Sequence, residues 1–121
     1  MNTKVEIERI VETSGLASAM KSGSLDVLAT PQMIAWMEEA ACLCLDLEEG
    51  MTSVGTLMNV EQVKASPKDA TIRIVAQITS QEGRKICFDV QAFQEDQLIG
   101  MGKHERFVVN ADKFLKKTYG K

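Results

Sequence analysis

The segment TPQMIAWMEEAACLCLDL, residues 30–47, decides the fold because its apolar residues cover most of a helical circumference. A helix that is apolar on nearly every side has to be enclosed by other structure. Thr30 before Pro31 predicts the helix start, since a Thr hydroxyl can cap free N–H groups and Pro fits the first helical position. The run Glu48–Gly50 predicts its end, with Gly50 as a left-handed C-cap. We therefore expect one central, buried helix.

Two adjacent carboxylates interrupt this apolar helix. Residues seven apart lie almost on one line of a helix, so Glu39 shares a stripe with the polar Gln32 and Asp46 and is predicted to face solvent. Glu38 instead lines up with Leu45 and has apolar neighbours. An acid on that side is costly to bury unless it is paired or functional. We predict that Glu38 is a site residue, with a satisfied buried or interfacial carboxylate as the alternative.

The rest of the chain predicts strands joined by turns. Charged and apolar residues alternate from Val5 to Val11, which is the period of a half-buried strand. The Ser- and Gly-rich residues 13–29 predict a loop with at most one helical turn. After the helix, alternation and turn residues predict an antiparallel meander of four long strands, at residues 53–65, 72–78, 86–92 and 98–109. The tail, ADKFLKKTYGK, predicts a helical turn or a frayed end.

One strand, one buried helix and four antiparallel strands form an α+β arrangement in which a long sheet wraps around one central apolar helix, the hotdog fold. We expect residues 1–121 to form a single hotdog domain. Such a sheet covers only one side of the helix. A homodimer that pairs two sheets edge to edge, or a higher homo-oligomer, is therefore expected.

Composition excludes several classes of protein. A net charge of -3 argues against a nucleic-acid partner, although a small anionic ligand held by local groups fits it. The first residues lack the apolar run of a signal peptide, and no window has the roughly 18 apolar residues of a membrane span. The three cysteines are predicted to be reduced thiols of a cytoplasmic protein. With one histidine and no Cys-x-x-Cys pair, no metal site is expected.

Six sequence pieces carry a resemblance to a known family. They are Thr30 and Glu38 in TPQMIAWMEEA, TSVGT at 52–56, NVEQVKASP at 59–67, EGR at 82–84, FDVQA at 88–92 and IGMGKHERFVV at 99–109. In this order and spacing the chain resembles the fluoroacetyl-CoA thioesterases of the hotdog superfamily. The segment before Thr30 is shorter than in the fluoroacetyl-specific enzyme, so the resemblance implies neither a substrate-gating lid nor that particular substrate.

The resemblance assigns roles to four positions. Members of the family use a helix-start Thr, a mid-helix Glu and a strand His to hydrolyse a thioester, with a Gly near the acyl group. Thr30, Glu38 and Gly55 match these residues, whereas Gln62 stands at the His position. Gln cannot exchange a proton near neutral pH, but it can hydrogen-bond a water or the thioester carbonyl. His104 belongs to a different shared piece and is predicted to be a hydrogen-bonded strand residue.

Two functions follow from these residues. The first is an acyl-CoA thioesterase without metal or redox cofactor, in which Glu38 acts as base or nucleophile on a small or medium acyl-CoA. Thr30 and Gln62 would then position water or substrate, and Gly55 would lie at the substrate. The alternative is a non-catalytic protein that binds acyl-CoA or an acyl carrier. Because eight helical residues place Thr30 and Glu38 about 12 Å apart, a site built between subunits is favoured.

Overall fold

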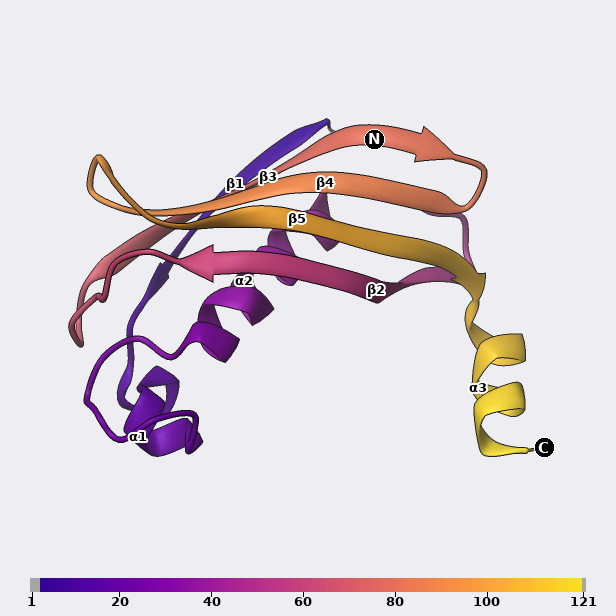
Figure 1. The fold of residues 1–121 in the computed structure, drawn as a ribbon. Helices are drawn as coiled ribbons and strands as arrows, with labels where there is room; N and C mark the ends of the chain where they lie inside the picture. The colour runs from indigo at the N-terminus through magenta and orange to yellow at the C-terminus, as the bar shows by residue number, and fades with distance from the viewer. Residues whose placement is uncertain (1–2, 121) are drawn as a thin grey trace.

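The computed structural model describes residues 3–120 and has a five-stranded antiparallel sheet curved around one helix (Figure 1). The sheet order is β1-β3-β4-β5-β2, which leaves β1 and β2 at the two edges. The central helix α2 lies against the concave face. The predicted α+β hotdog fold is confirmed. The strands are β1 (Lys4–Ile10), β2 (Met51–Gln62), β3 (Thr71–Glu82), β4 (Lys85–Gln94) and β5 (Gln97–Asn110).

The core lies between α2 (Thr30–Leu43) and the concave face of the sheet. Helix residues three or four apart, Met33, Met37, Ala40 and Ala41, are fully buried, as the spacing of one helical face requires. Each large apolar side chain buried in this way contributes about 1.5–3 kcal/mol. The sheet contributes alternate residues, mainly Ile72, Ile74, Ala76, Ile86, Phe88, Val90, Ala92 and Ile99.

Both predicted ends of the central helix need correction. The helix ends at Leu43, not near Gly50, and Gly50 instead adopts a φ of +84° in the turn that leads into β2. A left-handed glycine favours either a C-cap or a turn, so the residue alone does not distinguish them. Ala29 is the N-cap, and the Thr30 hydroxyl makes no capping bond because it points to Gln62. Pro31 lies in the first turn, as predicted.

The segments outside the core follow the expected pattern with small differences. The loop between β1 and α2 contains two short helical pieces, η1 (Thr13–Gly15) and α1 (Ala17–Met20), rather than one turn. The tail forms a regular helix, α3 (Ala111–Tyr119), which was one of the two predicted alternatives. The three cysteines are unpaired. Within residues 3–120, no helix is long and apolar enough to cross a membrane.

Strand β2 connects this fold to the predicted site. It pairs with β5 along its whole length, and the register shifts between Gly55 and Leu57, which is a β-bulge. Its end, at Gln62, lies beside the start of α2, whereas its bulge lies beside the middle of α2. The predicted site residues therefore fall into two groups along one strand.

Candidate active site

The first group surrounds the carboxylate of Glu38. Arg106 Nη1 donates to Glu38 Oε2 at 3.0 Å. Arg106 is itself nearly buried and fixed by Ser53, since its Nε donates to Ser53 Oγ at 2.8 Å and its Nη2 to the Ser53 carbonyl at 3.1 Å. The Glu38 side chain keeps 41% of its surface exposed. A rigid guanidinium thus holds an acid that solvent and small molecules can still reach.

Gly55 provides the space that this carboxylate occupies. A Cβ at position 55 would lie 2.6 Å from Glu38 Oε2, and 3.3 Å from both Arg106 Nη1 and His104 Cε1. Any side chain here would displace the acid. The register shift of β2 starts at Gly55, so this glycine belongs to the β-bulge of the strand. The strand therefore brings a bare backbone up to the carboxylate.

His104 lies beneath the same group and is 1% exposed. Its Nδ1 lies 2.8 Å from the Leu57 carbonyl oxygen, and its Nε2 lies 3.2 Å from Arg106 Nη1. Burial first, and the Arg106 charge second, lower the pKa of His104, while the Leu57 carbonyl and Glu38 act in the opposite direction. We infer a neutral ring that donates from Nδ1–H to Leu57 and accepts from Arg106 at Nε2. This matches the predicted hydrogen-bonded strand residue.

The second group consists of Thr30 and Gln62. Thr30 Oγ1 donates to Gln62 Oε1 at 2.5 Å, while Gln62 Nε2 lies 3.4 Å from the carbonyl oxygens of Leu28 and Lys64. These contacts fix the orientation of the Gln62 amide. Both residues line an open cavity of about 340 Å³ between the loop before α2 and the end of β2. The neighbouring lining residues are Ala17, Ser22, Val27, Leu28, Pro31, Val63, Lys64 and Ala65.

Within one chain the two groups do not meet. Thr30 and Glu38 lie about 12 Å apart along the axis of a regular helix, and none of the hydrogen bonds or ion pairs among residues 3–120 joins them. The structure brings Glu38 together with Gly55, and Thr30 together with Gln62. It does not bring all four together in a single subunit.

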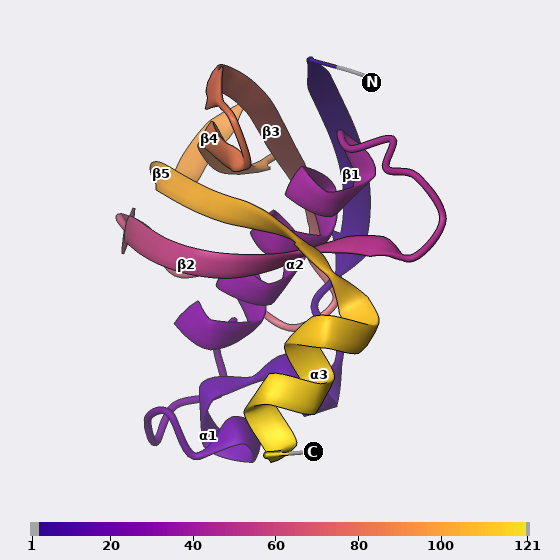
Figure 2. The same cartoon turned by 90° about the vertical axis from the view of Figure 1, so that its right-hand side faces the viewer.

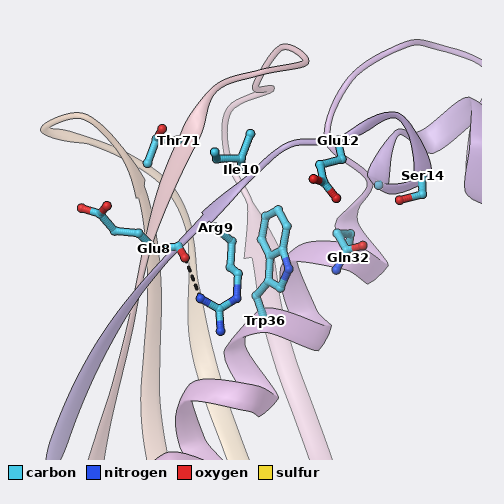
Figure 3. A pocket seen from close by; sticks show the side chains of 9 residues that line it. Glu8, Arg9, Ile10, Glu12, Ser14, Gln32, Trp36 and Thr71 are labelled. Carbon is cyan, nitrogen blue, oxygen red and sulfur yellow. Dashed lines mark hydrogen bonds between the residues drawn. The ribbon is translucent and has the colours of Figure 1, made fainter.

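Glu39 lies on the other side of α2, as the helical stripe predicted. Its carboxylate accepts from Arg9 Nε at 3.1 Å and from Arg9 Nη2 at 2.5 Å. Beside this pair, Trp36 and Arg9 border a cavity of about 430 Å³ between β1 and α2 (Figure 3). This cavity contains none of the predicted site residues. The two adjacent acids of the helix therefore belong to different surfaces of the molecule.

The contacts of Arg106 and Ser53 at this site were not predicted from the sequence. The signal for Arg106 was present, because residues 104 and 106 of a strand share one face and His104 was already singled out. Ser53 carries no comparable signal, since serine at a strand start is common. No group of three or more His, Cys, Asp or Glu residues that could hold a metal ion occurs in the described part of the chain.

Comparisons with known proteins identify the family of this chain. The model of the fluoroacetyl-CoA-specific thioesterase family, FlK, matches residues 11–112. The fluoroacetyl-CoA thioesterase of Streptantibioticus cattleyicolor is 36% identical over 95 residues, which is 77% of this chain and 68% of that protein.

Solved structures of FlK have the same fold. One superposes with a TM-score of 0.93 at 28% identity, covering 100% of this chain and 96% of the other. A variant of FlK in complex with fluoroacetate and CoA superposes with a TM-score of 0.86 at 29% identity, covering 94% and 98%. The chain therefore belongs to the fluoroacetyl-CoA-specific thioesterase (FlK) family of the hotdog thioesterase superfamily.

Proposed function

We propose that the protein hydrolyses a small or medium acyl-CoA thioester, with Glu38 as the general base or the nucleophile. The observation that carries the proposal is the Glu38 carboxylate, held by Arg106 against the bare backbone of Gly55. Homologous structures contain fluoroacetate and CoA, or acetyl-CoA. A thioester carbonyl presented to the Gly55 strand would meet an oriented acid with no side chain in between.

Two routes are open to this carboxylate. As a base, Glu38 removes a proton from water while the water oxygen bonds to the thioester carbon. As a nucleophile, it bonds to that carbon directly and forms an anhydride that water then hydrolyses. In both routes the C–S bond breaks, CoA leaves as a thiolate that takes up a proton, and the free acid is released. Backbone N–H groups near Gly55 would stabilise the intermediate oxyanion.

Thr30 and Gln62 enter the proposal through a homodimer. Since one chain leaves them about 12 Å from Glu38, the complete site would combine Glu38 of one subunit with Thr30 and Gln62 of the other. The open edge of β2 supports this assembly, because its sequence MTSVGTLMNVEQ contains neither Lys nor Pro, the residues that commonly protect sheet edges. In this arrangement the Thr30–Gln62 pair positions water or the thioester carbonyl.

A specific observation favours a second candidate, a protein that binds acyl-CoA or an acyl carrier without hydrolysing it. By the family resemblance Gln62 stands at the position of the catalytic His, and its amide exchanges no proton near neutral pH. His104 offers no replacement, because it is buried and both of its ring nitrogens are engaged. In this case the fold and the pocket would remain while the chemistry is lost.

A panel of short and medium acyl-CoAs with a thiol reagent separates the two candidates. We expect the purified protein to release free CoA faster than the buffer control for at least one ester. Binding is measured in parallel by calorimetry with a non-hydrolysable thioether analogue of each ester. Binding without release of CoA would overturn the thioesterase proposal and support the binding protein.

A further inference from the structure

Helix α3 is a well-formed helix that the rest of residues 3–120 leaves largely uncovered. The Asn110 side chain caps its start by accepting from the Lys113 N–H at 3.0 Å, and Gly120 ends it with a φ of +72°. Lys116 and Lys117 lie in the last turn, where positive charge suits the helix dipole. The local sequence therefore encodes this helix at both ends.

No residue of α3 is buried, although one side of the helix is apolar. Phe114 is 41% exposed, Leu115 52% and Tyr119 73%. An isolated helix of nine residues is marginal in water, and its stability normally comes from packing of an apolar face. Within the described residues, α3 packs mainly against β5. A further surface is therefore needed to cover Phe114 and Leu115.

The position of α3 indicates where that surface lies. Asn110 pairs with Met51 at the start of β2, and the Ala111 N–H donates to the Gly50 carbonyl at 2.9 Å. Helix α3 thus leaves the sheet beside the open edge, on the same side as α2 (Figures 1 and 2). Figure 1 shows α1 on this same side, at the opposite end of β2.

Uncovered apolar side chains also occur in α1, in the loop after it and just past the end of β2. Met20 is 40% exposed, Leu25 68% and Val63 52%. Val63 lines the cavity of about 340 Å³ that also contains Thr30 and Gln62. In one subunit this end is separated from α3 by the twelve residues of β2, roughly 40 Å at about 3.3 Å per residue. The chain therefore cannot cover this group with its own helix.

Symmetry brings the two apolar groups together. When two copies pair their β2 edges in antiparallel fashion, the start of one β2 lies beside the end of the other. A two-fold axis perpendicular to the sheet keeps the helices of both copies on one side. Helix α3 of each subunit then stands at the partner's α1 and at the mouth of the partner's cavity.

We propose that α3 is an arm that docks on a second copy of this chain and closes one wall of the partner's Thr30–Gln62 cavity. Phe114 and Leu115 pack against Leu25 and Val63 of the partner subunit. The inference rests on the homodimer of the proposed function, and it adds a segment of the partner to the substrate pocket. Each pocket of the dimer would then be incomplete without the tail of the other subunit.

Disulfide trapping tests the contact without reference to activity. In a background with Cys42→Ser and Cys87→Ser, we expect Leu115→Cys combined with Val63→Cys to form mostly covalent dimers under mild oxidation. Leu115→Cys alone, and Leu115→Cys combined with Ile10→Cys on the far edge, serve as controls and should give few. Equal yields in all three proteins would overturn the arm. Failure of thioester hydrolysis would leave this readout unchanged, so the two proposals fail separately.

Removal of the apolar contact gives an independent measurement. We expect Phe114→Ser combined with Leu115→Ser to weaken the dimer at least about tenfold in sedimentation equilibrium, because buried apolar side chains of this size dominate such contacts. Lys113→Ser, on the polar side of α3, is the matched control and should leave the dimer constant unchanged. An unchanged dimer constant in the double variant would overturn the proposal.

Discussion

The two polar groups along α2, one around Glu38 and one around Thr30, differ in charge and in the kind of side chain that they contain. At Glu38, the buried Arg106 guanidinium bonds to the carboxylate and is itself held by Ser53 and the neutral His104 ring. Around Thr30, a hydroxyl and an amide bond to each other and to backbone carbonyls, and no charged group takes part in those bonds. Both groups border β2, yet only the first contains a carboxylate that can act as a base or a nucleophile.

This difference indicates that the two groups would have different roles, one in the reaction and one in orienting the substrate. The Thr30–Gln62 pair can orient a polar atom, but neither side chain accepts a proton at neutral pH. In the proposed mechanism the acid–base or nucleophilic step therefore falls to Glu38, and the contacts of Glu38 with Gly55 and Arg106 would determine where that step takes place. The following variants change one side of the comparison at a time.

The largest effect is expected for Glu38→Gln. The variant keeps the size and most hydrogen bonds of the side chain but removes its basicity and nucleophilicity. We expect the rate of CoA release to fall at least about a thousandfold, with acyl-CoA binding retained, as for the loss of a principal catalytic group. Steady-state kinetics with the best ester of the panel, together with calorimetry, provide the measurement.

The adjacent acid is the matched control for that variant. Glu39 binds Arg9 on the opposite surface, and such exposed ion pairs contribute little to stability. Glu39→Gln should therefore change the rate of CoA release less than about twofold. Equal losses in the two variants would mean that the helix is damaged and that Glu38 has no special role.

The next largest effect is expected for Gly55→Ala. The added Cβ would lie 2.6 Å from Glu38 Oε2, so the carboxylate has to move by several tenths of an ångström or more. Displacement of a reacting group on this scale costs up to about a hundredfold in rate. We expect a lower kcat with a nearly unchanged melting temperature, because Gly55 is exposed in the isolated chain. Gly83→Ala, at a hairpin far from the site, controls for general loss of stability.

Periodicity was enough to predict the central helix, the strand pattern and the separation of Glu38 from Glu39. Each of these depends on the repeat of one element, and a repeat of 3.6 or 2 residues is visible in sequence. Arg106 was harder to predict, because its partners Glu38 and Ser53 lie 68 and 53 residues away in the chain. Contacts of that kind follow from the register of β2 on β5, which the pattern leaves open.

The ends of the central helix show the same limit. Thr30 has the residue type of an N-cap, but its hydroxyl instead bonds to Gln62, 32 residues away. Local preference predicted the cap, and a tertiary contact overrode it. The sequence resemblance named both Thr30 and Gln62. Their contact could not be predicted, because it depends on the placement of α2 beside the end of β2.

A moderate gain is expected for Gln62→His, which supplies the proton acceptor that the family resemblance implies at this position. If the Thr30–Gln62 group only positions substrate, a proton-exchanging ring there should raise kcat about tenfold or more. The gain should grow as pH rises through about 6.5, where a histidine of ordinary pKa loses its proton. Gln62→Asn, which exchanges no proton, should show neither the gain nor the new pH limb. A flat pH profile for Gln62→His would contradict this interpretation.

The smallest effect is a pH dependence of stability from His104. Burial, aided by Arg106, lowers the pKa of His104 in the folded protein, so the unfolded chain binds a proton at a higher pH than the folded one. Stability from this residue is therefore fully present above about pH 6.5 and is lost as pH falls through that value toward the folded pKa. Thermal unfolding of the wild type and of His104→Asn between pH 8 and pH 5 measures it. We expect the melting temperature of the wild type to approach that of His104→Asn as pH falls. A difference in melting temperature that stays constant with pH would show that His104 is not kept neutral by its surroundings.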